Sequence, residues 1–424
     1  MNTTHGPFPN ATGYHTAVEL DNADALTRFR AEFVHDADEI IYLDGNSLGR
    51  LPQDTERHLA DVVTAEWGRD LISSWGKRWW DLPRRLGDQI APLIGAPQGS
   101  VVVADSTSVV LFKLAWSALI SQQPRGRILT DDHNFPTDLY ILRAAAEAAG
   151  GKQIDVIESG GDIDGPEERI LDAIDSDTAL VALSHVTFRS GFRYDIESVT
   201  SAAHDAGALV LWDLSHSVGV VPTDLRKVDL AVGCTYKYLN GGPGSPAFLY
   251  VHPDLDIRNP LTGWWGHQSP FSFDPEYEPA TDITRFQTGT MPILSLTALE
   301  PALSVTNAAG IIPIRKKSVQ LTSFLIDLAD EVLSPLGFEV ASPRDPVRRG
   351  SHVSLRHADA WRITQAMLAD GAMVPDFREP HYIRLGLAPL YTRFIDVHTS
   401  VNRIAALVLS GAHTTYPQER SDVT

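Results

Sequence analysis

The chain has 424 residues with 43% hydrophobic and 21% charged side chains, which is typical of a globular protein with one large α/β domain or two domains. Its formal net charge of −19 argues against nucleic acid and anionic membranes as partners, because both are negatively charged themselves. There is no apolar run of the ~20 residues that a membrane span needs. The N-terminus lacks the basic start and apolar core of a signal peptide. Cys234 is the single cysteine, which excludes an intramolecular disulfide and a cysteine metal cluster. We therefore expect a soluble, cytoplasmic protein.

From about residue 100, short apolar runs alternate with longer helical stretches. The pattern predicts strands at 100–106, 127–132, 178–186, 208–216, 231–235 and 247–251, and helices at 109–120, 137–150 and 198–207. Such alternation predicts an α/β fold with a mostly parallel sheet and helices on both faces. A helical run at 294–310 and shorter mixed elements follow. We expect a large domain at 50–300, and a smaller α+β domain at 301–424 together with about 1–49.

Polar side chains follow five of the predicted strands, at the point where each strand ends. They are Asp105 to Ser108, Asp131 to Asn134, Ser184 and His185, Asp213 to His216, and Tyr236 and Lys237. Ligands of parallel sheets bind at the carboxyl ends of the strands. The sequence therefore predicts that these five segments meet at one crevice.

Lys237 stands between two tyrosines, after an apolar strand and before the glycine-rich turn GGPG. Burial would disfavour its charge and leave a nucleophilic amine near neutral pH. The alternative is an ordinary surface lysine at a strand end. Pyridoxal phosphate (PLP) bonds to a lysine amine and uses its ring as an electron sink. The protonated ring nitrogen needs a buried carboxylate, and Asp213 after ALVLW fits that role, although it could also be a helix N-cap.

Three further residue groups fit a PLP site, each with an ordinary alternative. Ser106, Thr107 and Ser108 precede the helix expected from Val109 and could bind a phosphate, or simply cap the helix. Phe135 could lie against the cofactor ring or belong to the core. Arg384 could hold a substrate carboxylate by two parallel hydrogen bonds, whereas the residues alone slightly favour a structural salt bridge.

Other chemistries have less support. The sequence contains no G-x-S-x-G nucleophile elbow. The segment GGPGSP at 241–246 matches neither a dinucleotide fingerprint nor a P-loop. The residues DDH at 131–133 are too few for a metal site, so we expect no metal.

Seven segments, in this order, resemble the kynureninase family: YLDGNSLG (42–49), DSTSV (105–109), NFPTDLYI (134–141), WDLSHSVGVVP (212–222), TYKYLNGGPG (235–244), GWWGH (263–267) and IRLGLAPLY (383–391). The resemblance covers about residues 40–397. It implies a PLP enzyme of the aspartate-aminotransferase fold type (fold type I) that acts as a homodimer. The implied reaction is hydrolysis of the carbon–carbon bond in L-kynurenine, 3-hydroxykynurenine or another ring-substituted kynurenine, giving an anthranilate and L-alanine.

The resemblance also assigns roles to individual residues. Lys237 would bind the cofactor aldehyde and act as general base, Asp213 would hold the ring nitrogen, and Tyr236 would transfer protons at the cofactor. The substrate α-carboxylate would bind Arg384, and the aromatic amine would lie near Trp75 and Ser47. The remaining cofactor contacts would be Thr107 and Ser108 at the phosphate, Phe135, Pro136, Thr137 and Asp138 around the ring, Ser184, His216, and Trp264 and Thr290 from the neighbouring subunit.

The sequence departs from the family pattern at three places. Residues 187–191 read TFRSG where NYRTG is expected, Val110 replaces an asparagine, and Met291 replaces a proline. These changes concern substrate choice, and they allow a ring-substituted kynurenine in a biosynthetic pathway rather than in tryptophan breakdown.

Two alternative functions remain open. One is a cysteine-desulfurase-like lyase, which would need a mobile catalytic cysteine, whereas Cys234 lies in a predicted strand. The other is a non-catalytic protein with the PLP fold, which the presence of both Lys237 and Asp213 disfavours.

Overall fold

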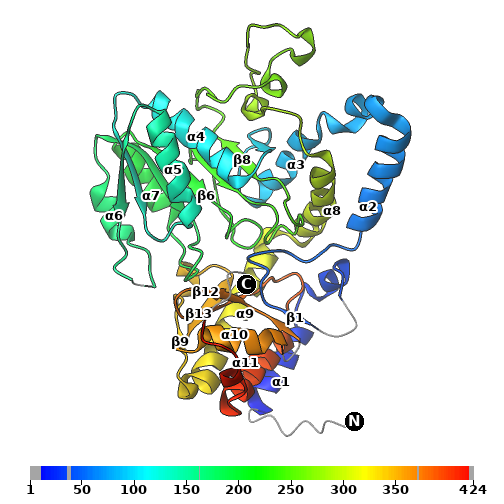
Figure 1. Cartoon of the computed structure of the whole chain (residues 1–424), viewed down its shortest axis with the longest axis vertical. Helices are drawn as coiled ribbons and strands as arrows, with labels where there is room; N and C mark the ends of the chain where they lie inside the picture. Colours follow the sequence, from blue (N-terminus) through cyan, green and yellow to red (C-terminus); the bar gives the residue numbers. More distant parts are fainter. Residues whose placement is uncertain (1–10, 36–39, 162, 370–371, 420–424) are drawn as a thin grey trace.

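The computed structural model describes residues 11–35, 40–161, 163–369 and 372–419. A large α/β part, with helices α2 to α8, lies above a smaller part that contains β9 to β13 and helices α1 and α9 to α11 (Figure 1). Among the described residues, no helix combines the length and apolar character needed to cross a membrane.

A seven-stranded sheet forms the centre of the large part, in the order β2-β8-β7-β6-β5-β3-β4. Its strands are β2 Val101–Val103, β3 Arg127–Asp131, β4 Gln153–Ile157, β5 Thr178–Ser184, β6 Leu209–Asp213, β7 Leu230–Gly233 and β8 Phe248–Val251. The run from β4 to β7 is parallel, and β8 is antiparallel to both β7 and β2. The predicted mostly parallel sheet is thus confirmed, and β2, β3, β5, β6 and β7 all end at the same edge.

Helices cover both faces of this sheet, because its strands present apolar side chains on both faces. One core packs the sheet against α4 (Thr107–Ser121) and α5 (Pro136–Ala148). The other packs it against α3 (Leu82–Ile90), α6 (Glu167–Ala173), α7 (Ile196–Asp205) and α8 (Ile293–Ala309). The helix expected from Val109 begins two residues earlier, so Thr107 and Ser108 lie in its first turn and Ser106 is the residue before it.

The smaller part has a four-stranded antiparallel sheet in the order β12-β13-β10-β9. Its strands are β9 Glu339–Val340, β10 His352–Arg356, β12 Asp376–Arg378 and β13 Tyr382–Gly386, and a second sheet pairs β1 Ile41–Tyr42 with β11 Met373–Val374. Its helices are α1 Ala11–Asn22, α9 Ile311–Leu328, α10 Ala360–Ala369 and α11 Phe394–Leu409. Ala17, Ile41 and Leu43 join residues 321–405 in one core, so N-terminal residues pack here.

The domain boundary expected near residue 300 stays a prediction. Helix α8 runs across that position, and its residues Leu296, Leu299 and Leu303 belong to the core of the large sheet. α2 (Thr55–Asp61) also packs on α8. The helical structure is next interrupted at Gly310, which has a φ of 79° and separates α8 from α9.

Short 3-10 and π turns connect the longer elements. They are η1 Thr27–Glu32, η2 Val62–Asp70, η3 Leu71–Ser73, η4 Trp75–Trp79, η5 Ala91–Leu93, η6 Trp264–Gly266, η7 Pro270–Ser272, η8 Ile283–Phe286, η9 Ala329–Leu333, η10 Ser334–Leu336, η11 Pro346–Arg348 and η12 Ala412–Thr415.

Candidate active site

Lys237 follows β7 and is half-buried, and its Nζ lies 3.1 Å from Nε2 of His216. His216 stands in the turn after β6 and is itself buried. Burial, and then the positive charge of Lys237, hold the pKa of His216 well below its usual value. The lysine amine therefore contacts a neutral imidazole.

Asp213 ends β6 directly opposite Ser184, the last residue of the neighbouring strand β5. Its Oδ1 accepts a hydrogen bond from the backbone N–H of Ser215 at 2.8 Å, so it caps a turn and not a helix. Burial, followed by the charge of Asp213, raises the pKa of Asp138 well above its usual value, and the Asp138 carboxyl hydrogen-bonds to Asp213 and Ser184. The Asp138 carboxyl group therefore holds its proton more readily than a free carboxyl group does.

Tyr236 lies beside this pair, with its ring centroid 5.9 Å from Nζ of Lys237. Burial, and then the neighbouring Cys234 and Asp213, raise the pKa of Tyr236, so its phenol stays protonated. Cys234 is buried, its Sγ faces the Ser215 carbonyl at 3.8 Å, and burial raises the pKa of its thiol. A buried, protonated thiol is unsuited to nucleophilic catalysis.

The first turn of α4 faces the same strand ends. Thr107 and Ser108 are half-buried there. Within the described chain, neither hydroxyl nor the backbone N–H groups of these two residues have a hydrogen-bond acceptor, which suits a helix terminus that binds a phosphate. Phe135 precedes α5, is 41% exposed, and meets the Phe188 ring edge-on at 5.3 Å. Pro136 and Thr137 begin α5 beside it.

Arg384, on β13, is only 1% exposed. Its Nη1 donates to the Phe188 carbonyl oxygen at 2.6 Å, and its Nη2 donates to Oγ of Ser47 at 2.8 Å. Asp376 forms an ion pair with the same guanidinium. With its amide oxygen turned toward Arg384, Asn46 accepts from Nε at 2.8 Å. The arginine is thus fixed between the two parts of the chain.

Trp75, Trp264 and Thr290 lie in a separate aromatic region. The Trp75 ring contacts the rings of Trp79 and Trp265, each at 5.2 Å. A cavity of about 420 Å³ has Trp75, Thr290 and Met291 in its lining. Trp264 is 42% exposed, and Thr290 is exposed as well. Within the described part of a single chain, these residues have no hydrogen bond, ion pair or ring contact with Lys237, Arg384 or Ser47.

Four residues near these sites escaped the sequence analysis. Asn46 lies within the motif YLDGNSLG, so the sequence indicated its segment but not its contact with Arg384. Lys113 interrupts an apolar helix, which is a signal of burial with a partner. Asp376 and His352 carry no such signal. His352 is fully buried, its ring lies 5.9 Å from that of His216, and neither of its nitrogens has a hydrogen-bond partner among the described residues.

These residues fit PLP: a lysine amine, a buried carboxylate pair and a helix terminus meet at the strand ends. The fold resembles solved structures of PLP-type enzymes. The cystine C–S lyase C-DES, in a variant with glycine covalently linked to its PLP cofactor, matches with a TM-score of 0.77 and 18% identity over 89% of this chain and 98% of its own. The cysteine desulfurase CsdA of Escherichia coli matches with a TM-score of 0.76 and 18% identity over 91% and 98%. The protein has the fold of type I PLP enzymes.

Sequence comparison defines the family. Residues 314–404 match the model of the kynureninase C-terminal domain. The kynureninase of Pseudomonas fluorescens is 41% identical over 94% of this chain and 96% of its own length. That of Burkholderia pseudomallei is 42% identical over 92% and 94%. The chain belongs to the kynureninase family.

Proposed function

We propose that Lys237, Asp213 and Tyr236 carry out the reaction of the kynureninase family in this chain, the PLP-dependent hydrolysis of L-kynurenine to anthranilate and L-alanine. The observation that carries these roles is the contact of the half-buried Lys237 amine with neutral His216, beside the Asp213–Asp138 pair. When bound, PLP supplies an electron sink for negative charge at the substrate α-carbon.

Lys237 is the residue that binds the cofactor aldehyde and later takes the proton from the substrate α-carbon. The neutral imidazole of His216 adds no second positive charge beside this amine. Its Nε2 lies 3.1 Å from Nζ, where it orients the amine by a hydrogen bond.

Asp213 supports a protonated ring nitrogen with its carboxylate, which lies beside the Asp138 carboxyl group. Ser184 completes this group through its hydrogen bond to Asp138. Tyr236 keeps its proton and can donate it to an oxygen atom nearby. We assign the proton transfers of the later steps to this phenol.

The remaining assignments concern binding. Thr107 and Ser108 hold the phosphate at the start of α4. The exposed face of Phe135 packs on the cofactor ring, with Pro136 and Thr137 beside it. Arg384 binds the substrate α-carboxylate, and Ser47, its hydrogen-bond partner, lies toward the substrate. The departures at Val110, Met291 and residues 187–191 leave open a ring-substituted kynurenine as the preferred substrate.

We also propose a cytoplasmic homodimer in which Trp264 and Thr290 reach the cofactor of the other subunit, and Trp75 reaches the substrate ring. In support, the large part carries several strongly exposed apolar side chains, of which Trp67 shares a cavity with Trp75 and Thr290 and Phe271 contacts the Trp264 ring. The most exposed of these side chains are Ile72, Phe273, Phe271, Leu71 and Trp67. The loop that carries Phe271 and Phe273 projects from the large part, at the top of Figure 1.

The test is incubation of the purified protein with L-kynurenine and, separately, with 3-hydroxykynurenine, and measurement of the anthranilate-type product and of alanine. Formation of both products in equal amounts supports the proposal, and the ratio of the two kcat/KM values defines the preferred ring. A competing desulfurase-like activity would release sulfide from cysteine, and the buried thiol of Cys234 argues against it.

A further inference from the structure

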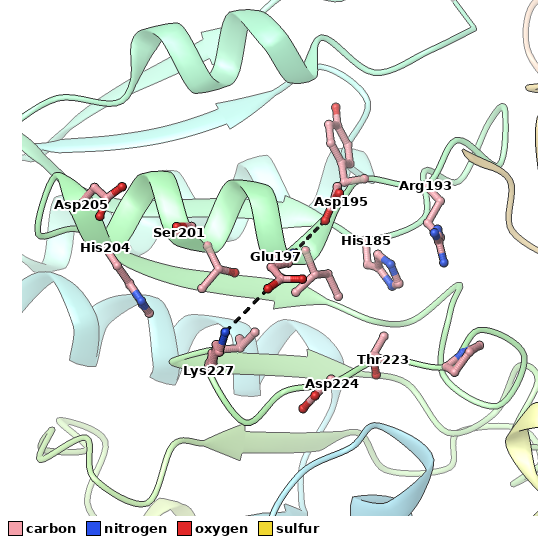
Figure 2. Close-up of a pocket in the computed structure, with 15 residues that line it drawn as sticks. His185, Arg193, Asp195, Glu197, Ser201, His204, Asp205, Thr223, Asp224 and Lys227 are labelled. Carbon is pink, nitrogen blue, oxygen red and sulfur yellow. Dashed lines mark hydrogen bonds and ion pairs between the residues drawn. The ribbon is translucent and has the colours of Figure 1, made fainter. Parts of the chain in front are cut away.

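A cavity of about 400 Å³ lies behind β5, on the side of the large sheet that α7 covers. It is bounded by α7 on one side and by residues 222–228 on the other (Figure 2). The volume is within the range of small-molecule sites. Its lining includes the apolar side chains of Ile196, Pro222 and Val228. None of the residues assigned above to the cofactor or the substrate lines it.

Two hydrogen-bonding side chains without a partner meet at one end of this cavity. His185 is 2% exposed, and its Nδ1 has no hydrogen-bond partner among the described residues. Nε of Arg193 is likewise buried without a partner there, and its guanidinium forms no ion pair with any described carboxylate. Figure 2 shows both side chains at this end of the cavity, and the charge of Arg193 is close enough to lower the pKa of His185. Buried polar groups normally have partners, so this pair calls for a ligand.

The acidic residues of the lining are mostly engaged elsewhere. Asp195 caps α7 by accepting from the N–H groups of Glu197 and Ser198 at 3.0 and 3.2 Å. Glu197 pairs with Lys227 at 3.6 Å, away from the His185 end (Figure 2). Asp224 is paired with Arg226. Asp205 is exposed at the opposite end of α7.

The charges that act on His185 are those of Arg193 and Arg315, and Arg193 itself lies in the field of Asp195, Asp345 and Glu167 without forming an ion pair with any of them. Burial, and then the charges of Arg193 and Arg315, hold the pKa of His185 well below its usual value, so its ring is neutral and offers one N–H donor. A guanidinium next to an N–H donor matches the two oxygens of a carboxylate.

We propose that this cavity is a second ligand site, which binds a small organic monocarboxylate through Arg193 and His185 and packs its apolar part against Ile196, Pro222 and Val228. The site adjoins the catalytic strands, because the His185 N–H donates to the Asp213 carbonyl oxygen at 2.9 Å and Ser184 precedes it on β5. An anthranilate belongs to this ligand class, so the site can take the aromatic product; that identification alone rests on the proposed function.

The test measures benzoate binding to the PLP-loaded protein by isothermal titration calorimetry. The variants are Arg193→Gln, which removes the charge, and Ser201→Trp, which fills the cavity from α7 without touching either donor. Arg356→Gln is the matched control, because it removes an equivalent charge from an exposed residue of the smaller part, and neither Arg356 nor its partner Glu339 lines the cavity. The absorption spectrum of the cofactor reports in each variant that the catalytic strands are intact.

We expect wild type and Arg356→Gln to bind benzoate equally, with Arg193→Gln and Ser201→Trp weakened by about tenfold or more. Benzoate binding that is unchanged in both cavity variants would overturn the proposal, as would wild-type protein that binds inorganic phosphate but no benzoate. If the kynurenine assay yields no product while benzoate binding depends on Arg193, the proposed function is rejected and the second ligand site is supported.

Discussion

Asp376 and Arg384 stand directly opposite each other on the antiparallel strands β12 and β13, and their side chains form an ion pair. The arginine is 1% exposed, so its charge needs such a partner. The structural salt bridge considered from the sequence therefore exists, and it also fixes the plane of the guanidinium. A fixed plane is what two parallel hydrogen bonds to a carboxylate require.

Arg384→Lys should raise KM for kynurenine and for 3-hydroxykynurenine alike, by roughly tenfold or more, because an ammonium cannot replace the planar fork. The absorption of the bound cofactor should stay unchanged. Steady-state kinetics with both substrates measures the effect. An unchanged KM would show that Arg384 has only a structural role, in its ion pair with Asp376.

Lys237→Ala should abolish the visible absorption band of the PLP-loaded protein and all turnover, because the amine that binds the cofactor aldehyde is gone. Lys227→Ala, which removes an exposed lysine of the same domain, is the control and should stay yellow. Absorption spectra of both variants after dialysis against PLP provide the measurement. A yellow Lys237→Ala protein would refute the assignment.

Asp213→Ala should retain part of its cofactor while losing roughly ten- to a hundredfold in kcat. A hydrogen bond to a charged group contributes roughly 1.5–3 kcal/mol, and here it supports the charge that builds up during reaction. Cofactor content by absorbance and kcat by product formation separate the two effects. Turnover close to wild type would show that another group holds the ring nitrogen.

Lys113→Met should lower the free energy of unfolding by about 3 kcal/mol or more, because it leaves a carboxylate without its buried partner. Nζ of Lys113 is fully buried and contacts Asp105 at 2.5 Å, the Phe286 carbonyl oxygen at 2.8 Å and Thr288 at 3.5 Å. Urea unfolding provides the value. The double variant Lys113→Met/Asp105→Asn should recover part of the loss, and no recovery would show that the ion pair is not the cause.

Trp75→His should change the ratio of kcat/KM for kynurenine and 3-hydroxykynurenine, with a smaller change in the cofactor spectrum. Trp75 shares a cavity with Thr290 and Met291, one of the departures from the family pattern. Kinetics with both substrates give the ratio. Equal losses for the two substrates would assign Trp75 to packing rather than to ring choice.

The sequence by itself determined the parallel sheet and the group of strand-end residues that includes Asp213 and Lys237. Both follow from local patterns: apolar runs of strand length, helices between them, and polar residues where each strand stops. Parallel strands end at one edge, so residues far apart in the chain could be placed together without knowledge of side-chain contacts. The helix start at Thr107 was missed by two residues, because the serine and threonine residues there suit either side of a helix boundary.

Only the tertiary structure decided which long-range partners these residues have. Asp376 meets Arg384 because β12 and β13 pair in one register, and Lys113 reaches Thr288 across 175 residues of chain. The sequence analysis expected His185 and Ser184 at one crevice. In the structure Ser184 hydrogen-bonds to Asp138, whereas His185 lines the cavity beside α7, because neighbouring side chains of an extended segment point to opposite faces of the sheet. Contacts of this kind depend on register and on packing between distant segments, and a local sequence pattern contains neither.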